Sequence, residues 1–402
     1  MQQANKYEHR TEKEIVFWIH DGKSVVKIFN GKEHGTITSQ EKKEHINRSW
    51  QYDELLVPYD GKEADIEANY HAYIQSIDNI KGITNNLINM YRTGSIFNTA
   101  KALFVKLTTI PESRFDKVEA YKFDYLNSCG GVRIAEEYVR CQLFYPYLLN
   151  TNMLRIPQKK GTLTDIDQQE FDEQEFVTIG IYHASITGDI NPKLFTVLKS
   201  NKYTHYEINR AKKLKYSIKI LGQALMWTPE QVVGAKKVFG EFVEYLFPLK
   251  KKDPVLKQIL NSLWGGLVSS RSTYTRVDTV ENLDIPQGAT IMKAEQLTQD
   301  TYKFTIHDKD CNTFKTNYGR LKPFLLGLGR CIVHKTIEEA GHEYIVYSHT
   351  DSLISRKFLN LTKNLNDRGL EMGQWKYEGR DNECEVFNMS RYKFEKSSTK
   401  KT

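Results

Sequence analysis

The sequence lacks the cysteine pattern of a disulfide-linked or zinc-binding protein. Its five cysteines are scattered, odd in number and never spaced as Cys-x-x-Cys; they are Cys129, Cys141, Cys311, Cys331 and Cys384. A disulfide framework or a zinc knuckle needs paired cysteines at short, regular spacings. We therefore expect reduced thiols and no metal held by cysteine.

Long apolar segments are absent as well. No run approaches the roughly 20 apolar residues that cross a bilayer. Residues 1–14 are polar and charged, where a signal peptide would be apolar. The sequence therefore predicts a protein without membrane contact that stays inside the cell.

A strong excess of one charge is also missing. The 402 residues include 57 Lys and Arg against 50 Asp and Glu, a net charge of +7, and 12% are aromatic. This balance suits a nucleic-acid-binding protein, but many other soluble proteins share it. The length leaves room for roughly two or three domains. Composition alone therefore does not specify the function.

The spacing of apolar residues predicts a mixed α+β chain. Alternating apolar residues indicate a hairpin over 14–29, short strands over 117–184, a strand-rich insertion over 274–315 and a second hairpin over 343–357. Spacings of three and four predict helices over 65–105, 229–246, 253–269 and 323–340. Helices that pack against antiparallel strands are typical of the α+β class.

Two of these elements carry polar residues that could bind a metal ion or a phosphate group. The segment Tyr347 to Ser352 reads Tyr-Ser-His-Thr-Asp-Ser at the tip of the second hairpin, a suitable platform for a metal-binding carboxylate. In the predicted helix 253–269, Lys257, Asn261, Trp264 and Gly265 lie on adjoining turns of one face. A lysine on such a face can hold a triphosphate.

These segments resemble motifs of the family B DNA polymerases. Tyr-x-x-Thr-Asp-Ser is similar to the third polymerase motif, Lys-x3-Asn-Ser-x-aromatic-Gly to the fingers motif, and Leu-Phe-Tyr-Pro at 143–146 to the end of the first motif. They follow the family's order. The pair Gly130-Gly131 and the segment Gly373 to Gly379 resemble the protein-primed branch, which replicates linear phage and plasmid genomes. The resemblance covers about residues 56–394 and implies a family B palm and fingers.

The same resemblance indicates lost catalytic acids. The first motif of the family begins with an aspartate six residues before its proline, where this chain has Arg140. The third motif normally reads Asp-Thr-Asp, and here it reads His349-Thr350-Asp351. A rival alignment with Asp124 as the first acid puts the double glycine on its wrong side. A polymerase needs two cations about 3.5–4 Å apart, which one carboxylate cannot assemble. We expect Arg140 to pair with Asp351 in the place of a metal.

The resemblance further implies that both ends are trimmed. The N-terminal part is similar to the end of the family's exonuclease, but its Tyr-x3-Asp motif reads Tyr73 to Ile77, with Asp78 one place late. The family's late Lys-x-Tyr motif has Ser390, or Arg391 in another register, in place of the lysine. With the sequence ending ten residues after Tyr392, a thumb domain is expected to be absent. We expect residues 1–115 to be an exonuclease-like remnant and 116–402 to be palm and fingers, with a strand-rich insertion near 274–315.

Further candidate residues follow from the resemblance or from charge. The resemblance implies nucleotide contacts for Lys257, Asn261 and Tyr145, and Tyr145 would screen the sugar 2′ position; a solvated lysine and a core aromatic are the structural alternatives. Candidate nucleic-acid contacts are two lysine clusters, Lys212, Lys213 and Lys215, and Lys250, Lys251 and Lys252. Such clusters are more often simply solvated faces, although in this fold they can also follow a phosphate backbone. His349 is expected to be a hydrogen-bonding turn residue rather than a metal ligand.

Three functions remain open from the sequence. The first is a catalytically inactive pseudopolymerase, without cofactor, that binds DNA or joins protein partners in a viral or mobile-element replication or virion assembly, in the host cytoplasm or the virion. The alternative is an active DNA polymerase subunit that adds dNTPs to a primer. Its Mg²⁺ ligands would come from Glu136 or Glu137, or from a second chain. The third is a structural protein that has lost nucleic-acid binding.

Overall fold

The structure, a computed structural model, describes residues 17–20, 25–29, 32–36, 75–93, 96–110, 123, 133–134, 139–141, 144–269, 272–276, 290–298, 301–307, 314, 316–349, 352–355, 372–377, 384–388 and 391–394. The predictions for Gly130-Gly131, Glu136, Glu137, Tyr73 and Asp351 lie outside these residues.

The chain forms two compact units. The first consists of Met1–Thr108 and Glu241–Gly266, and the second of Thr109–Gly240 and Leu267–Thr402. The region expected to be polymerase-like therefore contributes to both units. The predicted division at residue 115 stays a prediction.

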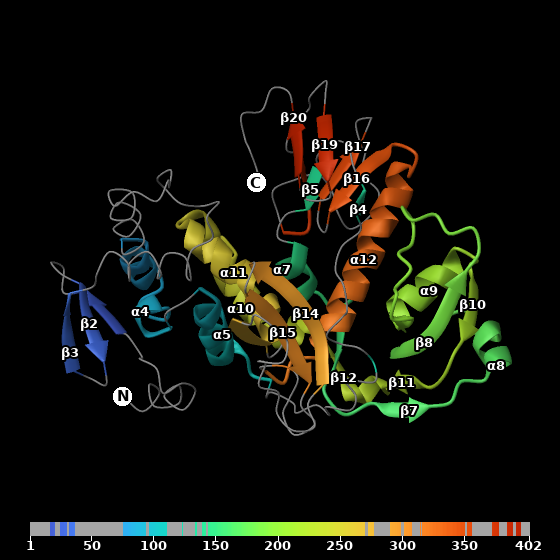
Figure 1. The fold of residues 1–402 in the computed structure, drawn as a ribbon, viewed down its shortest axis with the longest axis horizontal. Coiled ribbons are helices and arrows are strands. Elements are labelled where there is room, and N and C mark those ends of the chain that lie inside the picture. Colours follow the sequence, from blue (N-terminus) through green and yellow to red (C-terminus); the bar gives the residue numbers. More distant parts are fainter. Residues whose placement is uncertain are drawn as a thin grey trace. The chain divides into compact units, whose positions relative to one another are not determined.

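The first unit begins with the predicted hairpin, which is confirmed. Strands β1 (Phe17–His20) and β2 (Val25–Phe29) pair antiparallel, with Phe17 opposite Ile28, and β3 (Lys32–Thr36) joins them. Residues 75–83 are helical, followed by α4 (Met90–Thr93) and α5 (Ile96–Leu107). The end of α10 (Ala235–Leu246), the short 3-10 helix η4 (Pro248–Lys251) and nearly all of α11 (Pro254–Leu267) complete the unit (Figure 1).

Asp253 fixes the start of α11. Its Oδ1 accepts a hydrogen bond from the backbone N–H of Val255 at 2.9 Å, and Pro254 stands at the first helical position, where its missing N–H costs nothing. The hydroxyl of Ser76 lies 2.8 Å from each carboxylate oxygen. Burial raises the pKa of the Asp253 carboxyl above its ordinary value, and these hydrogen bonds partly oppose the rise. Asp253 thereby ties helix 75–83 to α11.

The second unit contains a five-stranded sheet assembled from three distant parts of the sequence. Its strand order is β18 (Trp375–Tyr377), β5 (Val139–Cys141), β17 (Ser352–Ser355), β16 (Ile345–His349) and β4 (Arg133–Ile134), and every pair is antiparallel. Strands β16 and β17 confirm the predicted second hairpin. Helix α7 (Phe144–Leu149) follows β5, and α12 (Leu321–Ala340) precedes β16 (Figure 1).

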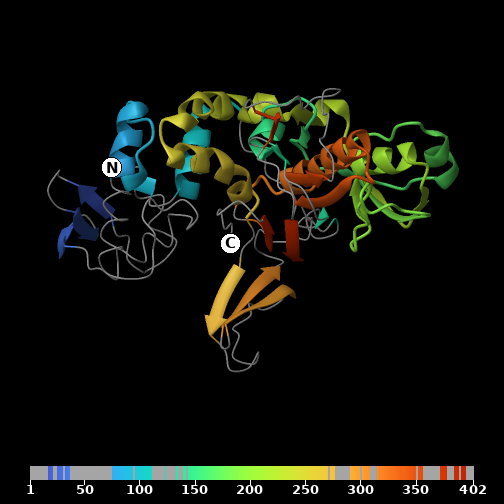
Figure 2. The ribbon, with the colours of Figure 1, turned by 90° about the horizontal axis from the view of Figure 1, so that it is seen from above.

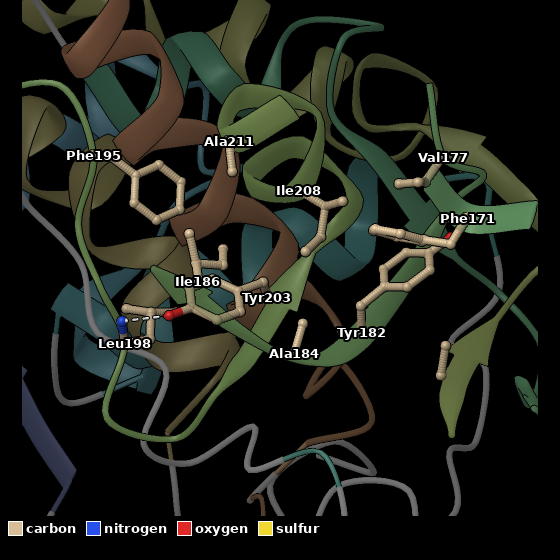
Figure 3. Close-up of a cluster of buried hydrophobic side chains, with 11 residues drawn as sticks. Phe171, Val177, Tyr182, Ala184, Ile186, Phe195, Leu198, Tyr203, Ile208 and Ala211 are labelled. Carbon is tan, nitrogen blue, oxygen red and sulfur yellow. Dashed lines mark hydrogen bonds between the residues drawn. The ribbon is translucent and has the colours of Figure 1, made fainter. Parts of the chain in front are cut away.

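A second sheet in this unit packs against a helix. Its main path is β10 (Ser217–Ile220), β8 (Gly180–Thr187), β11 (Ala224–Met226) and β7 (Thr162–Thr164), and β9 (Lys202–Thr204) also pairs with β8. Helix α9 (His205–Lys213) lies over β8 and β10 (Figure 1). Figure 3 shows the buried cluster between them, in which the N–H of Leu198 donates to the hydroxyl of Tyr203 at 3.0 Å.

Helix α9 is joined to α12 by a buried carboxylate. Glu207 Oε2 accepts hydrogen bonds from the N–H and the hydroxyl of Thr204, both at 2.9 Å, which caps the start of α9. Its Oε1 accepts from Arg330 Nε at 2.9 Å and from Nη2 at 2.6 Å. A Cβ at Gly327 of α12 would collide with the Thr204 hydroxyl, so this close approach requires glycine. Helix α12 leads directly into β16, so these bonds anchor the helix that precedes the hairpin.

Besides the pair of β6 and β12, two further sheets lie in the described part of the second unit. Strands β13 (Ser272–Arg276), β14 (Thr290–Thr298) and β15 (Thr301–His307) form a sheet where strands were predicted over 274–315, and they are yellow and orange in Figure 2. Strands β19 (Cys384–Asn388) and β20 (Arg391–Phe394) form a two-stranded sheet.

Two local predictions are corrected, and one helix was missed. The helix predicted over 229–246 begins only at Ala235, because 229–231 form a 3-10 turn and β12 (Val232–Gly234) pairs with β6 (Arg155–Pro157). The β-branched Val232 and Val233 favour the strand. The region 117–184 contains α7 and α8 (Gln168–Glu173) besides strands, and Asp167 caps α8 by accepting from the Glu170 N–H at 2.9 Å. Helix α9 was not predicted.

Candidate functional site

The strands of the first and third sequence motifs lie side by side in the five-stranded sheet. On β5, Arg140 is directly opposite Ser352 of β17 on one side and Lys376 of β18 on the other. On β16, His349 is directly opposite Ser352 and Arg133 of β4. The sheet therefore brings the two replaced motif positions, 140 and 349, next to the residue that follows Asp351.

The adjacent row of the sheet is uncharged. It runs through Tyr377, Val139, Leu353, Ser348 and Ile134, each directly opposite the next. Leu353 and Ser348 are fully buried. Since successive residues of a strand face opposite sides of the sheet, positions 140 and 349 belong to the opposite face, on which Ser352, Tyr347 and Ile354 are buried as well.

Contacts from α12 and a loop hold the hairpin in place. Gly341 caps the C-terminal end of α12 with a positive φ of 86°, which suits glycine, and the Tyr344 N–H then donates to the Gly341 carbonyl at 3.0 Å. The ammonium of Lys193 donates to the carbonyl of Ile345, the first residue of β16, at 2.6 Å. The hairpin that carries the third motif is thus fixed at its base.

The four motif residues of α11 that the sequence analysis placed on one helical face form a stripe on the outer side of the helix. Lys257 and Gly265 are exposed, Asn261 and Trp264 are half-buried, and the opposite face is buried through Leu256, Ile259, Leu260, Leu263 and Leu267. The four motif residues therefore form the outward face of an amphipathic helix. Lys257 and Asn261 belong to the first unit and the motif strands to the second.

Gly265 and Gly266 of α11 offer a matched pair of substitutions. A Cβ at Gly265 would meet no atom within 4 Å, whereas a Cβ at Gly266 would overlap the Phe97 ring of α5. Gly266→Ala should lower the free energy of unfolding by about 1–3 kcal/mol. Gly265→Ala should leave it unchanged or raise it by up to about 1 kcal/mol through helix propensity. Urea denaturation measures both, and equal effects would contradict the packing of Phe97 against Gly266.

The predicted lysine contacts divide into internal and exposed groups. The Lys212 ammonium donates to the carbonyls of Phe171 and Gln174 and lies 4.2 Å from the centre of the Phe171 ring. Burial lowers the pKa of Lys212. Its contacts give Lys212 a structural role at the end of α8, so the nucleic-acid prediction for this cluster rests on Lys213 and Lys215, which are exposed.

The second lysine cluster lies in and after η4. Lys251 and Lys252 are exposed, and the Lys250 ammonium lies 3.7 Å from the centre of the Phe247 ring, a cation–π distance. Tyr145 is half-buried in the first turn of α7, directly after β5 and its Arg140. Its role beside the nucleotide stays a prediction.

The predicted ion pair of Arg140 and Asp351 stays a prediction, because Asp351 and the side chain of Arg140 lie outside the described residues. Within the described part of the chain, no group of three or more His, Cys, Asp or Glu side chains is placed to hold a metal ion. Sequence reasoning missed two positions next to the motifs, Arg133 and Lys376. Both stand in segments that the resemblance had already marked, after Gly130-Gly131 and within Gly373 to Gly379.

Comparison with known proteins identifies the fold. No protein-family model and no curated protein matches the sequence. Among solved structures, the chain is similar to Phi29 DNA polymerase complexed with single-stranded DNA, with a TM-score of 0.57 and 14% identity over 93% of this chain and 68% of that chain. The complex of that polymerase with primer-template DNA and incoming nucleotide substrates gives a TM-score of 0.57 and 12% identity over 94% and 71%. Its post-translocation binary complex with primer-template DNA gives 0.55 and 12% over 89% and 65%.

At sequence identities of 12–14%, the structural similarity establishes the fold alone. The chain has the fold of a protein-primed family B DNA polymerase, and the resemblance seen in its motifs is confirmed at that level. The absence of a thumb and the trimming of the exonuclease stay predictions. Among the described helices, none is both long and apolar enough to cross a bilayer.

Proposed function

We propose that the protein is a pseudopolymerase, a catalytically inactive homologue of the family B DNA polymerases that binds nucleic acid. It serves as a nucleic-acid-binding or scaffold component of a viral or mobile-element replication or virion assembly. Its place is the host cytoplasm or the virion, its partners are DNA and other proteins of that assembly, and it needs no cofactor.

The position of Arg140 carries this proposal. A polymerase-like sheet sets the first-motif strand β5 beside the third-motif hairpin, yet its motif position holds an arginine directly opposite Lys376. Guanidinium does not lose its proton in proteins. Two divalent cations do not fit beside these fixed positive charges, and one carboxylate cannot hold them. The arrangement supports a palm that has exchanged its metal site for a cationic one.

Retained surfaces support nucleic-acid binding. The motif stripe of α11 and the lysines at 213, 215, 251 and 252 face solvent. The similar Phi29 polymerase has been seen with single-stranded DNA and with primer-template DNA. We transfer DNA as a partner to this chain on the strength of that fold and of these exposed cations.

Binding should be electrostatic and independent of base sequence. Each phosphate contact makes the logarithm of affinity fall by about 0.7–0.9 per decade of salt. The double variants Lys213→Gln with Lys215→Gln, and Lys251→Gln with Lys252→Gln, should each reduce that salt slope by about 1.4–1.8. Fluorescence anisotropy with a labelled oligonucleotide at several salt concentrations measures the slope.

Lys335→Gln is the matched control, because Lys335 is exposed on α12 and belongs to neither cluster. Its slope should equal that of the unmodified protein. Failure to bind single- or double-stranded DNA at low salt would contradict the nucleic-acid role and favour a purely structural protein.

A further inference from the structure

Strand β7 is a terminal strand of the second sheet. Among the described strands it pairs with β11 alone, and Figure 1 shows it at the margin of that sheet. Its residues are Thr162, Leu163 and Thr164, and the first two are exposed. The N–H and C=O groups of a terminal strand that point away from its neighbour can pair with another chain. At β7 the sheet can therefore be extended.

Strand β10 also has a single neighbour among the described strands, but its open groups are covered. The side-chain N–H of Gln168 donates to the Ile218 carbonyl at 3.1 Å, and its side-chain oxygen accepts from the Ile220 N–H at 2.9 Å. The exposed Lys219 lies between these two residues, and lysine is one of the devices that keep terminal strands from pairing with other chains. Strand β7 contains no charged residue, so it lacks this protection.

Leu163 is the outer end of an apolar row that crosses the sheet. It lies directly opposite Leu225 of β11, which in turn lies opposite Ile181 of β8. Leu225 and Ile181 are 2% and 1% exposed, whereas Leu163 is 40% exposed. Directly opposite side chains share one face of a sheet and stabilise it by packing. The row is thus buried up to β7 and open there, as expected where a further strand continues it.

The residues that flank β7 are charged in a self-complementary order. Lys159 and Lys160 precede the strand, Asp165 and Asp167 follow it, and all four are exposed. If two identical strands pair antiparallel around Leu163, Lys159 of one copy lies opposite Asp167 of the other, because 163 − 159 equals 167 − 163. Asp165 of the other copy is then a diagonal neighbour of Lys159. The pairing is repeated at the second end by symmetry.

Both ends of this segment are held in place. The indole N–H of Trp227 donates to the Lys159 carbonyl at 2.9 Å. Asp167 has an extended backbone, with φ −70° and ψ 131°, and its Oδ1 caps α8 by accepting from the Glu170 N–H at 2.9 Å. Pairing therefore requires little further ordering of the chain, which favours association.

We propose that β7 pairs antiparallel with β7 of a second copy of this chain, around a two-fold axis at Leu163. The apolar row then continues through the two leucines into the second copy, and a Lys159–Asp167 pair closes each end. A two-fold interface uses the same patch on both copies, which this self-complementary segment supplies. One short strand buries little surface, so the dimer is weak and dissociates on dilution. The inference goes beyond the proposed function and does not depend on it.

Sedimentation velocity of the full chain, without nucleic acid, tests the dimer. The sedimentation coefficient should rise with protein concentration, and Leu163→Lys should weaken self-association about a hundredfold, because it removes the leucine contact and sets two lysines opposite each other. Leu221→Lys is the matched control, since Leu221 is 43% exposed but lies outside β7, and it should associate as the unmodified protein does. A monomer at every concentration, or undiminished association of Leu163→Lys, would overturn the proposal and leave the pseudopolymerase untouched.

Charge reversal tests the register. Lys159→Glu and Asp167→Lys each set like charges opposite each other at both ends, so each variant alone should self-associate about tenfold more weakly. An equimolar mixture of the two should recover the association, because only the heterodimer has opposite charges at both ends. The lost cap of α8 in Asp167→Lys is the same alone and in the mixture, so it cannot produce the recovery. A mixture that associates no better than either variant would refute the pairing of Lys159 with Asp167.

Discussion

Replacing Glu207 by glutamine should lower the free energy of unfolding by about 3–5 kcal/mol, because it leaves the guanidinium of Arg330 buried without its counter-charge. The two side chains are only 4% and 3% exposed, and Arg330 Nη2 lies 2.6 Å from Glu207 Oε1. The carboxylate accepts four hydrogen bonds, two from Thr204 and two from Arg330. An amide can accept at one end only, so one pair of these donors loses its acceptor.

Urea denaturation of Glu207→Gln measures this loss. Glu343→Gln is the matched control, because Glu343 forms a solvent-exposed pair with His342 at 3.0 Å, and such pairs contribute less than about 1 kcal/mol. Combining Glu207→Gln with Arg330→Met should recover part of the stability, since the unpaired charge is then gone. A loss below about 1 kcal/mol for Glu207→Gln would show that this ion pair does not anchor α9 to α12.

Acid should destabilise the protein between pH 6.5 and about pH 4, because two buried histidines are neutral in the fold. Burial lowers the pKa of both His334 and His205 to about 4 from an ordinary value of 6.5. In His334, Nδ1 faces the Lys193 carbonyl at 3.0 Å and so must donate, and Nε2 lies 3.0 Å from the Thr196 hydroxyl. Arg210 and Arg330 further oppose a second proton.

The direction of this change in stability follows from the number of protons that the folded and the unfolded chain bind. Below pH 6.5 these histidines bind protons in the unfolded chain, whereas in the folded chain they stay neutral down to about pH 4. The free energy of unfolding therefore falls throughout that range. With 1.36 kcal/mol per pKa unit, each histidine contributes on the order of 3 kcal/mol to this loss.

Titrating stability from pH 7.5 to pH 4 tests the prediction. His334→Gln should reduce the pH dependence of the free energy of unfolding by about the contribution of one histidine. A stability that is constant over this range would contradict the neutral, buried state of these imidazoles.

Local patterns predicted the elements that carry the motifs. The apolar alternation around 347–352 was sufficient for the hairpin β16–β17, because its two strands are neighbours in the sequence. The spacing of Lys257 and Asn261 was sufficient for the exposed face of α11, because a helix satisfies its hydrogen bonds locally.

The pairing of strands that are distant in the sequence could not be predicted from local patterns. Strand β18 joins β5 although more than two hundred residues separate them, and this register alone places Lys376 opposite Arg140. The same holds for Val232 to Gly234. Their sequence predicted part of a helix, but in the structure they form a strand that pairs with β6. Lys212 looked like its neighbours in the lysine cluster, and only its contact with the end of α8 separates it from them.

Primer extension by the purified chain tests the central claim most directly. The protein is incubated with a labelled primer-template, all four dNTPs and either Mg²⁺ or Mn²⁺, and Asp351→Ala prepared in parallel controls for a contaminating polymerase. We predict no extension by either protein, because Arg140 stands where the first metal-binding acid is required. Extension by the unmodified protein that Asp351→Ala abolishes would contradict the pseudopolymerase and establish an active enzyme.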